Sequence, residues 1–212
     1  DIISPQYLAD LVAWGAIGAR TTESQVHREM ASGLSCPVGF KNGTGGDVRI
    51  AVDAVGAASH PHHFLAVGKD GRCAIATTAG NPDCHVILRG GAVPNYDGAH
   101  VDAAAGVLQA QDLRAALMID ASHANSGKNP DNQPEVIEDI ARQIEAGEDR
   151  IVGAMIESHL VAGQQALKPG VPLVYGQSIT DGCIDWSTTV RTLDRLADAV
   201  RTRRAKAGSQ AA

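Results

Sequence analysis

Aromatic side chains and long apolar runs are scarce in this sequence, and both shortages restrict what the protein can be. Only 3% of its 212 residues are aromatic, whereas 23 are glycine, a composition that suits helices packed closely on a sheet. No apolar run approaches the ~20 residues of a membrane-spanning helix, and no signal peptide is recognisable. The net charge of -6 gives no basic stripe for nucleic acid. We therefore expect a cytoplasmic protein that binds neither membranes nor nucleic acid.

Several common motifs are also missing. No pair of cysteines forms a C-x-x-C motif, so the sequence contains neither a zinc knuckle nor a redox pair. We expect reduced, buried cysteines in a cytosolic protein. Neither G-x-x-x-x-G-K-[ST] nor G-x-G-x-x-G occurs, so nothing supports nucleotide binding. The four cysteines are Cys36, Cys73, Cys84 and Cys183.

The first residues predict that the sequence begins inside a larger domain. The sequence begins with Asp1 and not with an initiator methionine. The next two residues, Ile2 and Ile3, are typical of the end of a strand. Ser4 and Pro5 then form an N-cap followed by a proline at the first helical position, so a helix is expected from Pro5 to Ala13.

Strands and helices are predicted to alternate along the rest of the chain. Each predicted strand is almost wholly apolar, which is typical of a parallel sheet covered by helices. One interruption, over residues 62–78, predicts a β-hairpin that turns at Asp70-Gly71. The predicted strands are residues 16–19, 37–40, 85–88, 117–119 and 151–156. Helices are predicted to begin at a capping box over Thr22-Glu23-Ser24-Gln25 and at a cap on Asp47. Another helix is predicted from the apolar spacing of Val136, Ile137, Ile140 and Ile144.

This alternation predicts a (β/α)8 TIM barrel that is truncated and lacks its N-terminal strands. Five strand–helix units follow the initial strand end, whereas a closed barrel needs eight units and about 250 residues. We expect residues 1–203 to be the C-terminal portion of a single barrel domain with the hairpin inserted. Residues 204–212 are expected to form a disordered tail.

Polar residues fall at or just after the ends of the predicted strands. They are Arg20, Lys41, Arg89, His123 and Glu157. In a (β/α) barrel the carboxyl ends of the strands meet on one face, which holds the active site. These five residues are therefore predicted to lie around one site.

The three cations predict an anion site. Arg20, Lys41 and Arg89 would repel one another in one cavity unless they bound a phosphate or carboxylate. Glycines follow Lys41 and Arg89 and would allow main-chain N–H groups to approach the same anion. The alternative is that these cations are solvated or paired with nearby acids.

His123, Glu157 and Asp181 are candidate metal ligands. Imidazole and carboxylate groups suit Mn²⁺, Fe²⁺ or Zn²⁺. The alternative is a core histidine with helix-capping acids, and periodicity alone does not place Asp181 near the others. The remaining histidines are weaker candidates, with exposed or helical positions expected for His27, His60, His62, His63 and His100, and His159 only two residues past Glu157.

Five segments of the chain resemble class I 3-deoxy-D-arabino-heptulosonate 7-phosphate (DAHP) synthase of the microbial, feedback-regulated type. The resemblance extends from about Ile3 to about Arg203, and the segments occur in the order of the family. They are GARTTESQ (18–25), PVGFKNGT (37–44), LRGG (88–91), DASHAN (120–125) and SITD (178–181).

The resemblance implies a fold, a reaction and a set of roles. The family has a (β/α)8 barrel and condenses phosphoenolpyruvate with erythrose 4-phosphate in the first step of the shikimate pathway. By resemblance, Arg20, Lys41 and Arg89 hold phosphoenolpyruvate. His123, Glu157 and Asp181 match ligands of a divalent metal, with Mn²⁺ or Fe²⁺ expected before Zn²⁺ or Co²⁺. Lys41 and His123 are the expected catalytic residues.

Two family segments have no counterpart in these 212 residues. The family has a fourth metal ligand, a cysteine in Gly-Pro-Cys-Ser, and a Lys-Pro-Arg-Thr segment that contacts both substrates. We therefore expect this chain alone to be inactive or nearly so, and the full-length protein to be active.

Regulation and assembly are also implied by the resemblance. Family members are inhibited by an aromatic amino acid, and the regulatory pocket resembles positions near Gln6, Leu34, Ser35 and Phe64, with the hairpin. Ala66 stands where a serine is common in phenylalanine-sensitive members. A homo-oligomer, either a dimer or a tetramer, is expected.

Two other functions are consistent with the sequence. One is a different barrel enzyme, namely a metal-dependent aldolase or the related synthase that uses arabinose 5-phosphate. The other is a non-catalytic fragment, because a barrel that lacks strands exposes two sheet edges.

Overall fold

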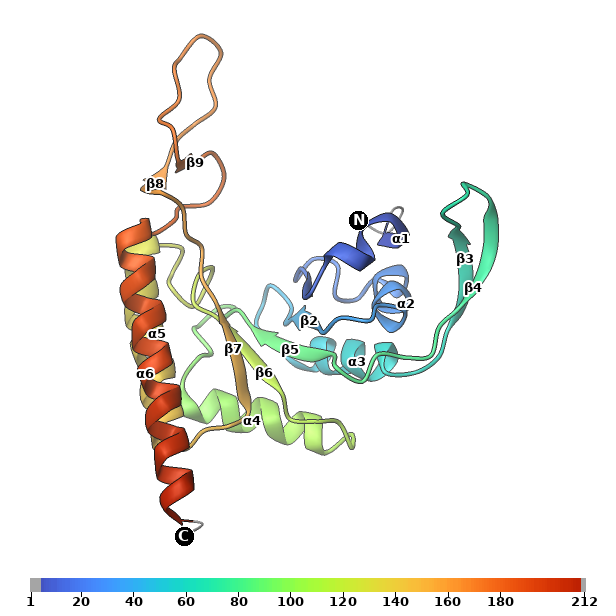
Figure 1. Cartoon of the computed structure of the whole chain (residues 1–212), viewed down its shortest axis with the longest axis horizontal. Coiled ribbons are helices and arrows are strands. Elements are labelled where there is room, and N and C mark those ends of the chain that lie inside the picture. The colour runs from blue at the N-terminus through green and yellow to red at the C-terminus, as the bar shows by residue number, and fades with distance from the viewer. Residues whose placement is uncertain (1–4, 211–212) are drawn as a thin grey trace. The chain divides into compact units, whose positions relative to one another are not determined.

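The computed structural model describes the backbone of residues 5–210, which divides into two compact units. The first unit contains the described residues up to Leu88 together with Ala103–Leu117. The second contains Arg89–Asp102 and the residues from Met118 onward. Figure 1 shows the elements in chain order. No helix in the described part of the chain is long and apolar enough to cross a membrane.

A parallel sheet forms the core of the first unit. Its strands are β1 (Gly15–Ile17), β2 (Val38–Lys41) and β5 (His85–Leu88), in the order β1-β2-β5. Ile17 pairs with Phe40, and Lys41 pairs with Ile87. All four residues of β5 are buried. The predicted fold class is thus confirmed as α/β with a parallel sheet, and within residues 5–210 no sheet closes into a barrel.

The helices of the first unit follow the predicted starts with two differences. They are α1 (Pro5–Leu8), the 3-10 helix η1 (Ala9–Leu11), α2 (Gln25–Ser32) and α3 (Arg49–Ala58). The helix expected from Pro5 to Ala13 is shorter, because it changes to 3-10 geometry after one turn. The capping box expected at Thr22 does not form, since Ser24 is the N-cap residue.

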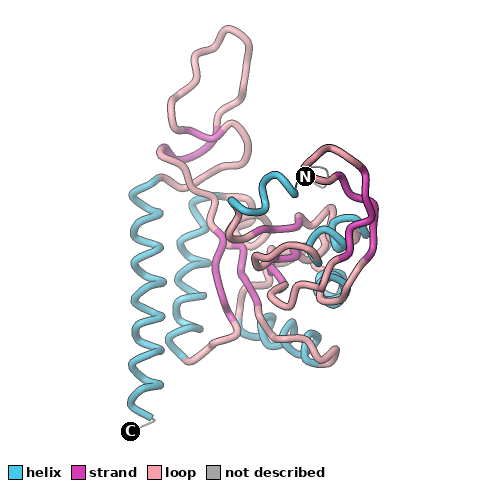
Figure 2. The backbone as a smooth tube through the Cα atoms, turned by 45° about the vertical axis from the view of Figure 1, so that its right-hand side comes forward, coloured by secondary structure: helices cyan, strands magenta, loops and turns pink. Residues whose placement is uncertain are grey.

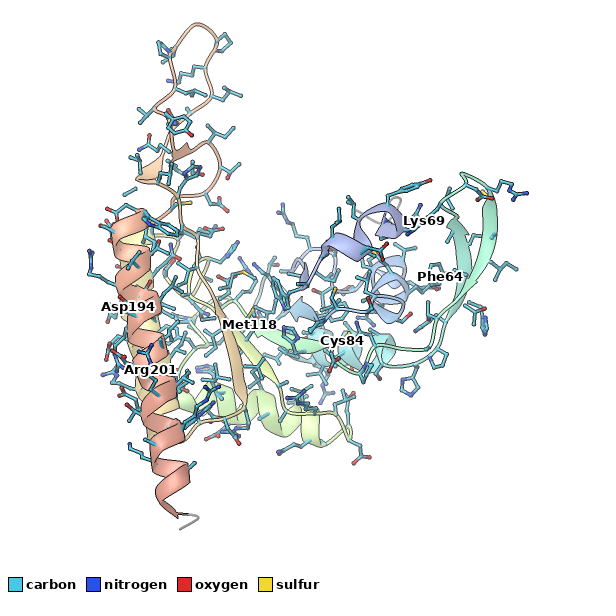
Figure 3. The ribbon with its side chains drawn as sticks, in the orientation of Figure 1. Phe64, Lys69, Cys84, Met118, Asp194 and Arg201 are labelled. Atoms are coloured by element: carbon cyan, nitrogen blue, oxygen red, sulfur yellow. The ribbon has the colours of Figure 1, made fainter. Side chains whose placement is uncertain are left out.

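The predicted hairpin is present as an antiparallel pair in the first unit. Its strands are β3 (His63–Val67) and β4 (Cys73–Thr77), with Leu65 opposite Ile75. The chain turns between them through Gly71, whose φ of +79° favours glycine. Figure 3 shows Phe64 on β3 and Lys69 at this turn.

The second unit combines two long helices with short strands. Its strands are β6 (Leu117–Asp120), β7 (Ile151–Met155), β8 (Val161–Gln164) and β9 (Gln177–Ser178), and β6 begins in the first unit. The N–H of Ala121 donates to Met155 at 2.9 Å, just where β6 and β7 end. The helices are α4 (Gly98–Gln109), which extends into the first unit, the 3-10 helix η2 (Pro130–Asn132), α5 (Gln133–Ala146) and α6 (Trp186–Gln210).

Helices α5 and α6 lie side by side in both views (Figures 1 and 2). Arg195 of α6 bridges them with hydrogen bonds to Glu138 and Glu145. Further along α6, Arg203 donates to the carbonyl of Glu148 at 2.6 Å, and Lys206 donates to that of Glu145 at 2.8 Å. These bonds explain why residues 204–210 are helical where we expected a disordered tail. Residues 211 and 212 lie outside the described residues.

All four cysteines are free thiols, as the lack of a paired motif predicts. Cys36 and Cys84 are buried in the first unit, as expected, whereas Cys73 is exposed on the hairpin and Cys183 is half-buried, so the expectation of burial is wrong for these two. Burial raises the pKa of the Cys84 thiol to about 12. Because the thiolate is the reactive form, this raised pKa keeps Cys84 protonated and less reactive at neutral pH.

His85, at the start of β5, is a buried histidine whose tautomer is fixed by its neighbours. The indole N–H of Trp14 donates to Nε2 at 3.1 Å, so that nitrogen is an acceptor. Nδ1 faces the carbonyl of Asp83 at 3.3 Å and therefore carries the proton. Burial, partly opposed by this bond, lowers the pKa of His85 below its ordinary value.

This lowered pKa predicts a loss of stability in acid. Below the unfolded pKa of about 6.5, the unfolded chain takes up a proton that the folded His85 resists, so the free energy of unfolding falls as the pH drops. His85→Gln should reduce this slope between about pH 7 and pH 5. Urea unfolding of both proteins in metal-free buffer at several pH values measures this slope. An unchanged slope in the variant would show that His85 does not cause the loss of stability in acid.

Candidate functional site

Two of the predicted anion-binding cations lie at one edge of the first sheet. Lys41 is the last residue of β2, and Arg20 follows the end of β1 by three residues. Because β1 and β2 are parallel neighbours, their carboxyl ends lie at the same edge. Arg20 is exposed and Lys41 is half-buried. The edge therefore presents two positive charges.

Thr22 connects the loop that carries Arg20 to the end of β2. Its side chain is fully buried, and Oγ1 lies 2.7 Å from the carbonyl of Lys41 and 3.1 Å from that of Gly18. Arg28 of α2 donates through Nε to the carbonyl of Thr22 at 2.9 Å. The turn after β1 is thus fixed against the residue at the end of β2.

Arg89 directly follows β5 and is the first residue of the second unit. Its carbonyl accepts from the N–H of Ala124 at 3.2 Å, close to the DASHAN segment. The next residue, Gly90, has φ +73°, and a Cβ there would come within 2.8 Å of the main-chain nitrogen of Asn125. Only glycine fits this position. Because Arg20 and Lys41 belong to the other unit, a single site for all three cations stays a prediction.

The three candidate metal ligands lie together in the second unit. One ligand atom from each of His123, Glu157 and Asp181 lies within 4.8 Å of the other two. Nε2 of His123 is 3.8 Å from Oε1 of Glu157. His123 and Glu157 are half-buried, while Asp181 is exposed.

Neighbouring side chains orient the histidine and the glutamate. Oδ2 of the buried Asp120 is 2.8 Å from Nδ1 of His123, close enough for an ion pair although not aligned as a hydrogen bond. Ser122 donates to Oε2 of Glu157 at 2.7 Å. His123 itself has φ +50°, a conformation that residues with a side chain rarely adopt. Such strain is typical of a functional site.

This donor set fits a divalent transition metal. One imidazole and two carboxylates are ligands that Mn²⁺, Fe²⁺ and Zn²⁺ accept. The carboxylate of Asp120 lies beside Nδ1, while Nε2 lies 3.8 Å from Oε1 of Glu157, so Nε2 is the ring nitrogen on the side of the other candidate ligands. The sequence did not single out Ser122 or Gln133, although Ser122 lies within the DASHAN segment. Gln133, which bonds the main chain of Glu157, gave no signal beyond a polar residue at the start of a helix.

The other histidines form no second metal cluster in the described part of the chain. His60 and His62 face carbonyls of α3, and His63 faces Thr77 across the hairpin. His159 is exposed, and its Nδ1 accepts from the N–H of Leu160. His27 and His100 face Ser24 and Asp97 within their own helical segments.

A cavity of about 480 Å³ opens in the first unit between α1, α2 and the hairpin. Gln6, Leu34 and Phe64, expected near a regulatory pocket, line it together with Ala66. Ser35 is not among the lining residues. Most of the surface is apolar, and the lining residues include Glu29, whose Oε1 accepts from the side chain of Gln25 at 2.7 Å.

A family profile and curated proteins both match this chain, and they name the same kind of enzyme. The profile of the DAHP synthetase I family matches residues 1–194. A Phe-sensitive phospho-2-dehydro-3-deoxyheptonate aldolase of Escherichia coli K12 is 59% identical over 96% of this chain and 58% of its own length. The tyrosine-inhibited aldolase of Schizosaccharomyces pombe is 56% identical over 96% of this chain and 56% of its own length.

A solved structure with the same protein name also matches this chain. The phospho-2-dehydro-3-deoxyheptonate aldolase of Francisella tularensis SCHU S4 superposes with a TM-score of 0.92 at 54% identity. It covers 96% of this chain, which in turn covers 59% of it. The chain therefore spans less than two thirds of the length of these relatives.

The bond from Thr22 to Lys41 predicts a specific loss of stability. Thr22→Val keeps the shape of the side chain but removes the donor, which should cost about 1–2 kcal/mol of unfolding free energy. Thr21→Val is the control, because Thr21 also bonds Gly18 at 3.1 Å but is only half-buried. Urea unfolding compares the variants, and equal losses would contradict the role of Thr22.

Proposed function

Because this chain belongs to the DAHP synthetase I family, we propose that its full-length protein condenses phosphoenolpyruvate with erythrose 4-phosphate. The products are DAHP and phosphate, in the first step of the shikimate pathway. The observation that carries the proposal is the convergence of His123, Glu157 and Asp181, with ligand atoms within 4.8 Å of one another. The names of the relatives support the same reaction.

The fold proposed for the full-length protein is a (β/α)8 barrel. Residues 1–203 would form the C-terminal portion of this single domain, with the hairpin as an insertion. The parallel strands β1, β2 and β5 support this proposal, because parallel sheets of this kind are covered by helices. The positions of Arg20, Lys41 and Arg89 at or just after the ends of these strands also support the proposal, because a barrel active site lies at the carboxyl ends of its strands.

Arg20, Lys41 and Arg89 are proposed to hold the phosphate and carboxylate of phosphoenolpyruvate. Lys41 and His123 are proposed as catalytic residues. Carbon 3 of phosphoenolpyruvate forms a bond to the aldehyde carbon of the sugar, and the aldehyde oxygen gains a proton. Water adds at carbon 2, and phosphate leaves as the C–O bond breaks. Fixed cations stabilise the charge that develops in these steps.

His123, Glu157 and Asp181 are the proposed ligands of a divalent ion, with Mn²⁺ or Fe²⁺ preferred over Zn²⁺ or Co²⁺. Bound there, the ion would polarise the sugar aldehyde as a Lewis acid. Asp120 would hold the ring of His123 with Nε2 toward the ligand position. Ser122, which donates to Oε2 of Glu157, would hold this carboxylate toward the same ligand position.

Phosphate release tests the proposed reaction. We expect the full-length protein with Mn²⁺ to release phosphate with erythrose 4-phosphate and far less with arabinose 5-phosphate. Lys41→Met should reduce turnover by about 100-fold or more, because a fixed charge at the developing transition state is lost. This chain alone should be inactive or nearly so, because it contains neither Gly-Pro-Cys-Ser nor Lys-Pro-Arg-Thr. A preference for arabinose 5-phosphate would instead favour the related synthase.

The cavity beside the hairpin is proposed to bind an aromatic amino acid that inhibits the enzyme. Its apolar lining suits an aromatic ring, and Glu29 is suited to face an ammonium group. The proposal draws on two relatives, whose names describe them as Phe-sensitive and tyrosine-inhibited. The full-length protein is further proposed to be a cytoplasmic homo-oligomer, either a dimer or a tetramer.

Effector binding should depend on Phe64. Phe64→Ala removes an aromatic wall of the cavity and should weaken binding of the preferred amino acid about tenfold. Ile75→Ala is the control, because Ile75 lies on the partner strand of the hairpin but is 72% exposed and does not line the cavity. Calorimetric titration of the full-length protein with phenylalanine, tyrosine and tryptophan measures each affinity. Equal losses in both variants would contradict the assignment.

A further inference from the structure

Gln133 is a fully buried glutamine whose two polar atoms both bind one residue. It is the first residue of α5, with 0% of its surface exposed. Its Oε1 accepts from the main-chain N–H of Glu157 at 2.8 Å, and its Nε2 donates to the carbonyl of Glu157 at 3.1 Å. These partners fix the orientation of the amide, because only the oxygen can accept and only the nitrogen can donate.

The main chain of Glu157 needs a hydrogen-bond partner because Glu157 lies beyond the end of its strand. Strand β7 ends at Met155, so Glu157 lies two residues past the end of the strand. Burying an amide is costly unless it is bonded, and both polar ends of the Gln133 amide are bonded to the main chain of this one residue, Glu157. The glutamine side chain therefore takes the place that a neighbouring strand would fill.

The same carbonyl also connects Glu157 to the segment that carries Asp181. The N–H of Ile184 donates to the carbonyl of Glu157 at 3.0 Å, and Ser158 forms an isolated parallel bridge with Ile184. Ile184 follows Asp181 by three residues. One peptide group thus joins Gln133, Glu157 and the chain just after Asp181.

We propose that Gln133 is a positioning residue for the divalent metal. It sets the main-chain position of Glu157 and, through Ile184, that of Asp181, while Ser122 orients the Glu157 carboxylate at its other end. This inference rests on the proposed metal-binding role of His123, Glu157 and Asp181. Side chains that orient metal ligands without touching the metal typically change metal affinity about 10- to 100-fold when they are lost.

The test compares Gln133→Met with Gln143→Met in the full-length protein. Methionine has nearly the same volume but forms neither hydrogen bond. Gln143 lies in the same helix and also donates to a main-chain carbonyl, that of Tyr96 at 2.8 Å, but it contacts no candidate ligand. Mn²⁺ affinity is measured by electron paramagnetic resonance of the free ion, and stability by urea unfolding without metal. His123→Ala reports whether Mn²⁺ binds at this site.

We expect Gln133→Met to weaken Mn²⁺ binding about tenfold or more, and Gln143→Met to leave it unchanged. Wild-type Mn²⁺ affinity in Gln133→Met, with His123→Ala impaired, would overturn this inference but leave the metal site intact. Equal Mn²⁺ binding by wild type and His123→Ala would overturn the metal site and the inference together. If the methionine variant does not fold, Gln133→Glu replaces it. Glutamate has the same shape but replaces the amide donor by a carboxyl group, so we again expect a loss of affinity at a pH where that group is ionised.

Discussion

Parallel strands leave main-chain N–H and C=O groups without ladder partners where they end, and a buried group of this kind must find another partner. In this protein the candidate functional residues stand at those strand ends. Side chains supply the missing partners there. The hydroxyl of Thr22 donates to the carbonyl of Lys41, and the amide of Gln133 bonds both the main-chain N–H and the carbonyl of Glu157. The positions of the candidate residues depend on these bonds.

In the DASHAN segment, side chains also supply hydrogen-bond partners to main-chain groups at a strand end. The amide of Asn125 donates to the carbonyl of Asp120, the last residue of β6, and its oxygen accepts from the N–H of Asn95. Asn95 in turn accepts from the N–H of Gly90, next to Arg89. Buried amides can make such bridges because each carries a donor and an acceptor. The segment after β5 and the segment after β6 are thus joined without a sheet ladder.

The sequence predicted those elements whose cause lies in nearby residues. The apolar run of residues 85–88 is β5, and Asp47 accepts from the N–H of Arg49 at the start of α3, where we expected a cap. The apolar spacing of Val136, Ile137, Ile140 and Ile144 placed the buried face of α5. In each case periodicity or a local hydrogen bond decides the outcome.

Features fixed by distant residues were not predicted. The helical continuation of α6 depends on Arg203 and Lys206 reaching carbonyls more than 50 residues away in the chain. Thr22 looked like a capping residue because its segment has that pattern, yet it bonds to Lys41, on the next strand. Gln133 carries no local sign that it faces Glu157. The family resemblance named ligands, but the bonds that hold them became visible only in three dimensions.

The hydrogen bond from Trp14 to His85 has a spectroscopic consequence. The chain contains two tryptophans, and they fall in different units, with Trp14 in the first and Trp186 at the start of α6 in the second. Trp14 is half-buried against an imidazole, whereas Trp186 is 57% exposed. Replacing either one would leave a single tryptophan, which can be excited apart from the three tyrosines. Each unit can therefore be followed by its own emission, without an added label.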